Sequence, residues 1–285
     1  MVSKYPILHY IDEIKTKLGF DRTMTAPGND VVDAINKIYA GGFDLKAWAE
    51  NSTDIAAHRN TFGGRNLGST FTAEQKANIA NNFKGFLTGD YWEINGAKHR
   101  IVDFSYFYNH GDTALTKPHL VIMPDLVMYN QRMHSSNDIT SVGYAGCEMR
   151  TSGLDSAKAT ITAFFGSVIS HREYLQTAVN STGKPSGGAW TDCTVEIPTE
   201  SMLFGNRIFS VANDGTVPNL YTNGKLQFAL FQLAPEFLNT RQHIWERDIV
   251  SGARFAVVNN FGGADYYGAS NTAVGVRPYY LVGAE

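Results

Sequence analysis

A change of pattern near residue 85 constrains the fold of this 285-residue chain more than any other feature. Before it, apolar residues recur with the 3.6-residue period of amphipathic helices. After it, short apolar runs alternate with long stretches rich in Gly, Asn, Ser and Thr. The two patterns predict an α+β chain. We expect a small helical domain over residues 1–84, followed over residues 85–285 by a domain with short strands, two helices and long loops.

The first part contains three apolar stretches with helical spacing. They run from Ile7 to Leu18, from Val31 to Ile38, and over Leu45 and Trp48. Thr72 and Gln75 have the spacing of a capping box and predict a further helix that carries Ile79 and Phe83. The stripe from Ile7 to Leu18 suits a helix–helix contact, either within the chain or between copies of it. We expect this domain to anchor the chain or to make an oligomer.

The second part begins with a predicted hairpin. Asn95-Gly96 separates the runs 91–94 and 97–104, and this pair supplies the two positive-φ residues that a type I′ turn demands. Further strands are predicted over residues 119–123, 201–204, 226–233, 255–258 and 276–281. Helices are predicted over residues 154–166, ending at Gly166, and over residues 170–179.

Composition excludes several classes of function. The net charge is −3, so no basic excess is present to neutralise phosphates, and we expect no nucleic-acid partner. No run of 18 apolar residues occurs, so we expect no membrane insertion. Asp12 and Glu13 lie where a secretory signal would be apolar, which predicts synthesis in a reducing cytoplasm without export. Cys147 and Cys193 are then more consistent with two buried free thiols than with a disulfide.

The sequence carries no motif for catalysis or metal binding. Residues 63–69 have the glycine spacing of a phosphate loop but lack its lysine, so a turn is the better interpretation. None of the eight histidines has a second one at the next helical turn. His171-Arg172-Glu173 is either a base with an orienting group or, as we favour, a hydrogen-bonded cap at a helix start. We predict no catalytic residue, no metal, no cofactor and no enzymatic activity.

The most informative segment lies near the end of the chain. Residues 256–276 read AVVNNFGGADYYGASNTAVGV and contain one charged residue, Asp265. Tyr with Asn, Ser and Gly is the composition of an antibody paratope, although an ordinary glycine-rich loop has it too. The predicted ligand-binding residues are Asn259, Asn260, Phe261, Asp265, Tyr266, Tyr267, Ser270 and Asn271. The predicted structural supports are Trp245, Arg247, Asp248 and Arg277. We expect Arg247 and Asp248 to form an internal ion pair. We expect Arg277, with Pro278, to pin the final strand.

Four short motifs, in order, resemble a domain common in phage and prophage proteins of gut Firmicutes. They are GDYWEING with RIVD (residues 89–96 and 100–103), SHREYL (170–175), WERDIVS (245–251) and GVRP (275–278). The motif AHRN at residues 57–60 extends the resemblance backwards. The ending is similar to the C-type-lectin-like fold of phage receptor-binding proteins, in which the last strands and loops display the ligand-binding residues.

The resemblance implies a virion protein that binds a host-cell surface receptor, either protein or glycan. It also implies other virion proteins as partners and a homo-oligomer, for which we expect a trimer. Some relatives are targets of diversity-generating retroelements, and substitution at template adenines would leave the mixture of Asn, Tyr, Asp, Ser and Gly seen at 259–271. Ordinary selection on a loop would leave the same mixture. The calcium and sugar triplets of animal C-type lectins are not recognisable.

Two alternatives stay open. The chain could decorate a capsid or form part of a tail without a receptor of its own. It could also be an oxidative enzyme of the formylglycine-generating type, which shares the same broad fold. The copper-binding cysteines of that type lie closer together than Cys147 and Cys193.

Overall fold

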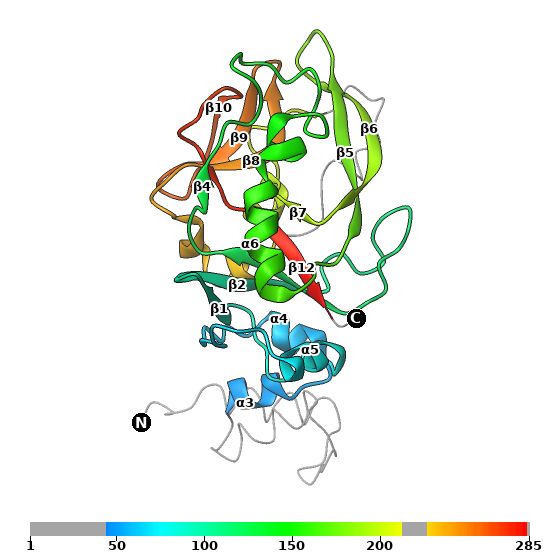
Figure 1. The fold of residues 1–285 in the computed structure, drawn as a ribbon, viewed down its shortest axis with the longest axis vertical. Helices are drawn as coiled ribbons and strands as arrows, with labels where there is room; N and C mark the ends of the chain where they lie inside the picture. Colours follow the sequence, from blue (N-terminus) through cyan, green and yellow to red (C-terminus); the bar gives the residue numbers. More distant parts are fainter. Residues whose placement is uncertain (1–43, 213–226, 284–285) are drawn as a thin grey trace, which may run out of the picture.

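The described part of the chain is a mixed assembly of helices and three β-sheets (Figure 1). The structure is a computed structural model that describes residues 44–212 and 227–283. The helices expected between residues 7 and 38, and with them most of the predicted anchoring domain, lie outside the described residues. Among the described residues, no helix is both long and apolar enough to cross a membrane.

Three short helices open the described chain: α3 (Leu45–Glu50), α4 (Ile55–Arg59) and α5 (Ala73–Ala80). The predicted capping box is confirmed at the start of α5. The Gln75 amide donates to Thr72 Oγ1 at 3.1 Å, and the Thr72 amide donates to Gln75 Oε1 at 3.0 Å. The amides at the start of a helix have no acceptor within the helix. These two reciprocal hydrogen bonds satisfy two of them and so fix where α5 begins.

The first sheet has the order β1-β2-β3-β12-β7. Its strands are β1 (Tyr91–Ile94), β2 (Ala97–Phe104), β3 (His119–Pro124), β12 (Tyr279–Gly283) and β7 (Val195–Glu196). The predicted hairpin between β1 and β2 is confirmed, with φ of 51° at Asn95 and 80° at Gly96. The last strand of the chain, β12, lies in the interior of this sheet between β3 and β7.

The second sheet has the order β10-β9-β8-β11-β4. Its strands are β10 (Ala264–Gly268), β9 (Arg254–Val258), β8 (Ile244–Ser251), β11 (Gly275–Val276) and β4 (Tyr129–Asn130). The strand predicted over 255–258 is confirmed. The strand predicted over 276–281 is divided, because Pro278 has no amide for a ladder and its two flanks join different sheets.

A separate two-stranded ribbon pairs β5 (His171–Val179) with β6 (Pro185–Cys193). The helix predicted over 170–179 is therefore wrong. From His171 to Leu175, buried and half-buried residues alternate, which is the period of two that belongs to a strand. The helix predicted over 154–166 is confirmed as α6 (Asp155–Phe165), which ends at Gly166 with φ of 79° and follows a π-helical turn, η1 (Met149–Gly153).

Two predicted strands are helices instead. Residues 201–204 belong to α7 (Glu200–Phe204), and the apolar run before residue 233 forms α9 (Ala229–Leu233), which leads into a 3₁₀ turn, η2 (Pro235–Leu238). Short apolar runs of this kind do not reveal their period. For α7 the deciding feature is local: Thr199 Oγ1 accepts a hydrogen bond from the Met202 amide and caps the helix.

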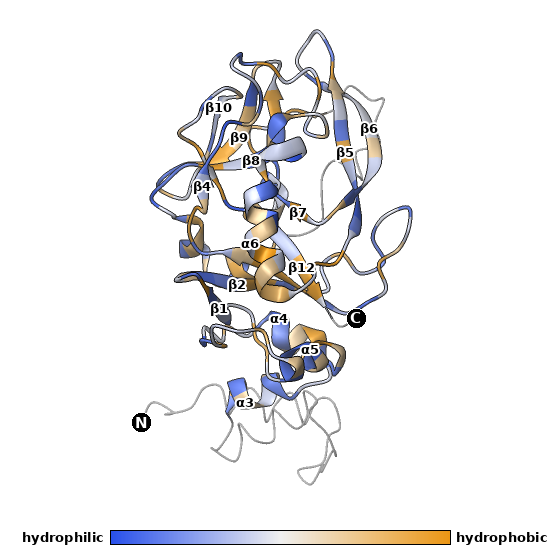
Figure 2. Cartoon of the chain, in the orientation of Figure 1, coloured by the Kyte–Doolittle hydropathy of each residue, from blue (hydrophilic) through white to orange (hydrophobic). Residues whose placement is uncertain are grey.

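Among the described residues, buried side chains form three large clusters and a fourth, small one. Figure 2 shows apolar stretches along β9, β12 and the C-terminal part of α6, with polar residues along the loops. One cluster joins Ile79, Phe83 and Phe86 to Trp92 and to Ile101 on β2. The domain boundary expected at residue 84 thus falls inside one packed cluster, and α5 shares its core with the first sheet.

Ile79→Ala tests this shared core. Ile79 is fully buried, so truncation should cost about 2–5 kcal/mol of unfolding free energy. Because α5 and the first sheet share a core, we expect one cooperative transition to shift, by about 2–4 °C for each kcal/mol. Calorimetry with parallel Trp fluorescence is the measurement. An unchanged main transition, with a minor early one, would indicate the separate helical domain that the sequence predicts.

Candidate functional site

The predicted binding segment, residues 259–271, forms the outer rim of the second sheet. It begins after β9, contains β10 and ends before β11. In Figure 1 it lies at the upper left, where β10 is the edge strand and pairs with β9 from Ala264↔Val258 to Gly268↔Arg254. The sequence prediction therefore falls on an edge strand and its two loops.

The turn between β9 and β10 is held by one side chain. Asn259 Oδ1 accepts hydrogen bonds from the amides of Phe261 (2.9 Å) and Gly263 (3.0 Å), and the Asn259 amide donates to the Gly263 carbonyl (2.7 Å). Gly262 has φ of 89°, a conformation that side-chain-bearing residues rarely adopt. This fixed turn carries Phe261, which is 79% exposed.

Two of the predicted ligand-binding residues, Tyr266 and Tyr267, are neighbours on β10 and therefore lie on its opposite faces. Tyr267 packs against the core cluster of the second sheet, and its hydroxyl lies 3.3 Å from Nε2 of His243. Tyr266 lies on the other face, paired with Ala256. Both rings are half-buried, but Tyr267 faces the core of the second sheet and Tyr266 faces away from it.

Tyr266 is joined on its face by residues from another part of the chain. Its ring packs edge-on against Phe209 with 5.2 Å between centroids, and the Arg254 guanidinium lies 5.0 Å from its centre. Phe209 is 40% exposed, and its neighbour Ile208 is 52% exposed. We call Ile208, Phe209, Arg254 and Tyr266 the aromatic patch.

A buried carboxylate positions the segment that supplies Phe209. Glu200 of α7 is fully buried, and its carboxylate accepts from the amides of Ile208 (3.0 Å), Phe209 (2.9 Å) and Ser210 (2.9 Å) and from the Ser210 hydroxyl (2.5 Å). Three backbone amides converging on one carboxylate fix the backbone at 208–210. The patch is thereby pre-formed rather than assembled on binding.

The remaining predicted residues mostly use their polar atoms to hold the local backbone. Asp138 Oδ1 accepts from the amide (2.9 Å) and hydroxyl (2.7 Å) of Ser270, and these two hydrogen bonds lower the pKa of Asp138. Asn271 Oδ1 accepts from the Ala273 amide, and Asp265 Oδ1 accepts from the Tyr266 amide. Asn260 is half-buried.

Two of the predicted supports, Trp245 and Arg277, are buried and donate hydrogen bonds to backbone carbonyls. Trp245 Nε1 donates to the Gln131 carbonyl at 2.6 Å. Buried Arg277 donates to the Pro124 carbonyl (2.7 Å) at the end of β3 and to the Phe237 carbonyl (2.9 Å), which ties the stretch between β11 and β12 to two other elements.

The predicted ion pair between Arg247 and Asp248 is wrong. The two residues are consecutive on β8, where the pairing with β9 is irregular, and each side chain has a different partner. Arg247 pairs with Glu173 and donates to the Tyr279 hydroxyl at 3.2 Å, whereas Asp248 Oδ2 accepts from the Glu200 amide at 2.7 Å.

The strand β8 also carries a concentration of buried carboxyl groups. Glu246 is fully buried, and neither of its carboxyl oxygens has a hydrogen-bond partner among the described residues. Burial, together with the charges of Glu200 and Asp248, raises its pKa well above the ordinary value. Burial and the charge of Glu200 also raise the pKa of Asp248 to about 7.

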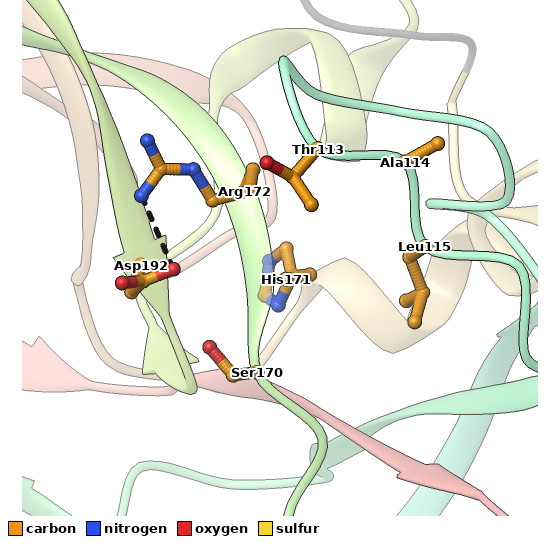
Figure 3. Close-up of a pocket in the computed structure, with 7 residues that line it drawn as sticks. All are labelled: Thr113, Ala114, Leu115, Ser170, His171, Arg172 and Asp192. Atoms are coloured by element: carbon orange, nitrogen blue, oxygen red, sulfur yellow. Dashed lines mark ion pairs between the residues drawn. The ribbon is translucent and has the colours of Figure 1, made fainter.

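The motif His171-Arg172-Glu173 stands in β5 rather than at a helix start, so its expected role as a helix cap is wrong. His171 and Glu173 point inward, with Nε2 and Oε1 2.8 Å apart. Burial opposes ionisation of Glu173, but the charge of Arg247 and the hydrogen bond from His171 outweigh it and lower its pKa. Arg172 points outward to Asp112 and Asp192, at the rim of a hollow drawn in Figure 3.

The two cysteines are free and buried, as predicted. Burial raises the pKa of Cys147 to about 12 and that of Cys193 further, so both thiols are held in the protonated form that neither attacks nor ligates. Within the described residues, 44–212 and 227–283, no group of three or more His, Cys, Asp or Glu side chains is arranged to hold a metal ion.

Sequence reasoning missed Phe209 and Arg254, which contact Tyr266, and Ile208, which precedes Phe209. Ile208 and Phe209 are more than fifty positions from Tyr266 in the sequence, and no local pattern links them to it. Thr199, directly before Glu200, is a residue type that caps helices and could have predicted α7. It does not predict the contacts made by the Glu200 carboxylate.

Comparison of the chain with family models, with characterised proteins and with solved structures finds no match. The functional interpretation therefore depends on the residues and on their geometry.

Asp248→Asn tests the buried carboxyl cluster. The folded chain keeps a proton on Asp248 up to about pH 7, whereas the unfolded chain loses it at about pH 4, so the unfolding free energy of the natural chain falls as the pH rises through this interval. The substituted asparagine would still accept from the Glu200 amide without carrying a charge. We expect a flatter profile and, at about pH 8, a gain on the order of 2 kcal/mol, measured by urea unfolding.

The matched control for this substitution is Asp54→Asn. Asp54 is the exposed N-cap of α4, and asparagine is an equally good cap, so its profile should follow that of the natural chain. If Asp248→Asn also follows the natural profile, the carboxyl of Asp248 does not titrate in this interval.

Proposed function

We propose that this chain is a binding protein, a phage virion adhesin that presents the rim of its second sheet to a host-cell receptor. The observation that carries the proposal is the pre-formed aromatic patch, together with the exposed ring of Phe261. Tyr266 and Phe209 contact each other and are held by β10 and by the Glu200 carboxylate, and Phe261 stands 79% exposed on a hydrogen-bonded turn.

Such a surface suits recognition for physical reasons. Aromatic side chains contribute large contact areas with few rotatable bonds, and they are over-represented among the residues that dominate binding energy. A backbone fixed beforehand loses little entropy on binding. The neighbouring Asn, Ser and Asp residues supply the polar rim that surrounds such anchors.

Virion display would compensate for weak individual contacts. Many copies on one particle turn later binding events into intramolecular ones, which multiplies the apparent affinity. We propose a homo-oligomer, a trimer, attached to other virion proteins through the N-terminal part. The proposal of a C-type-lectin-like fold is supported by the motif resemblance and by the position of the 259–271 segment among the last strands of the chain.

The test is a combined substitution, Phe261→Ala with Tyr266→Ala. The Phe261 ring is exposed, the Tyr266 ring is half-buried on the edge strand, and neither belongs to a core cluster of the described residues, so the thermal unfolding transition should change little. Binding of the labelled full chain to intact gut Firmicutes cells should fall at least about tenfold. The matched control is Tyr267→Phe, which keeps the inward ring and removes only the hydroxyl near His243, and should bind normally.

Two results would contradict this assignment. Undiminished cell binding by the double variant would exclude Phe261 and Tyr266 as the residues that contact the receptor. Antibody labelling of the capsid shell rather than the tail tip would favour the structural virion protein. Sequencing the gene across its source population gives an independent check, because a diversified binding surface would concentrate substitutions at adenine positions encoding residues 254–272.

A further inference from the structure

A hollow of about 460 Å³ lies at the start of the β5–β6 ribbon, outside the 259–271 segment. In Figure 3, residues 113–115 form one wall, residues 170–172 form the opposite wall, and Asp192 of β6 stands at the rim. Its volume is within the range of small-molecule sites. The residues that line it therefore define which ligand chemistry would fit.

The rim is rich in hydrogen-bond acceptors. The Arg172 guanidinium donates to both oxygens of Asp112 (2.7 and 2.9 Å) and lies 3.2 Å from Asp192 Oδ1. Most of its donors are thus already used, and two carboxylates surround one positive charge. The Asp192 side chain is 74% exposed and can accept further hydrogen bonds. This rim disfavours an anion and favours a ligand that donates hydrogen bonds.

His171 lines the same wall, but its side chain is engaged on the inner face of the ribbon. Its Nε2 lies 2.8 Å from the Glu173 carboxylate, and its ring packs against Phe107 with 4.2 Å between centroids. The ring is buried, so it shapes the wall of the hollow, and the polar groups open to a ligand are those of the rim.

An aromatic group lies beside the rim on the same face of the ribbon. Trp190 pairs with Tyr174 across the strands, and its ring meets Tyr174 edge-on at 5.5 Å and His110 at 5.7 Å. Tyr174 lies across Gly188, where any side chain would collide with its ring. Trp190 and Tyr174 are half-buried, so these rings are ordered and still partly open to a ligand.

We propose that this hollow binds a saccharide residue. A sugar offers several hydroxyl donors to the exposed Asp192 carboxylate, and the C–H groups of its ring suit the apolar surface of Trp190 beside the rim. The site would be a second binding site of the chain, separate in its residues from the aromatic patch.

The experiment uses the isotope-labelled full chain and NMR detection of the Trp190 indole N–H and the amides of residues 170–172. The probes are the methyl glycosides of glucose, galactose, mannose and N-acetylglucosamine, with inorganic phosphate and tetramethylammonium as probes of opposite charge. At about 10 mM, a ligand with a Kd of about 1 mM is roughly 90% bound. We expect saturable shifts of these signals with at least one glycoside and none with phosphate.

Asp192→Ala should weaken glycoside binding at least about tenfold, while Arg172 stays held by Asp112. The matched control, Glu236→Ala, removes an exposed carboxylate on η2 and should change nothing. Tyr266→Ala should keep the glycoside response, which separates this site from the proposed adhesin surface. The proposal is overturned if no glycoside shifts these signals, if only phosphate or tetramethylammonium does, or if Asp192→Ala binds as the natural chain does.

Discussion

The carboxylate of Glu173 lies where the three sheets meet. It faces His171 within β5, accepts from Arg247 of β8 and accepts from the Tyr279 hydroxyl of β12. Each sheet thus contributes a partner to one buried anion. Taking a carboxylate and a guanidinium out of water is expensive, and the cost is offset only when the partners are all in place. This requirement fixes β8 relative to β12, and with β8 the strands β9 and β10 that carry the predicted binding segment.

A second buried carboxylate transmits that order to the surface. Asp248 of β8 accepts from the amide of Glu200, and the Glu200 side chain collects the amides of residues 208–210. Phe209 reaches Tyr266 of β10 in consequence. The aromatic patch is therefore built from two distant segments that converge through buried acidic groups. Asp248 and Glu200 thus act from inside the chain on a surface whose own side chains are mostly apolar or aromatic.

Both candidate binding surfaces follow one design. Aromatic rings lie on strands at or near a sheet edge, and ion pairs or carboxylate–amide contacts hold the segments beside them. At the rim of the second sheet these are Tyr266 and Glu200, and at the ribbon they are Trp190 and Arg172. The sequence indicated the first surface through its unusual composition. It carried no comparable signal for the second, because the residues of that hollow come from three separate segments.

Local chemistry in the sequence was enough for some elements. The Thr72–Gln75 capping box, the Asn95-Gly96 turn and the glycine that ends α6 depend on neighbours along the chain, so each is decided by a few adjacent residues. Tertiary structure alone decided that residues 171–179 form a strand, that Arg247 pairs with Glu173 rather than Asp248, and that Tyr266 and Tyr267 face opposite ways. These outcomes depend on partners far away in the sequence, and short apolar or polar runs take the form that buries them best against those partners.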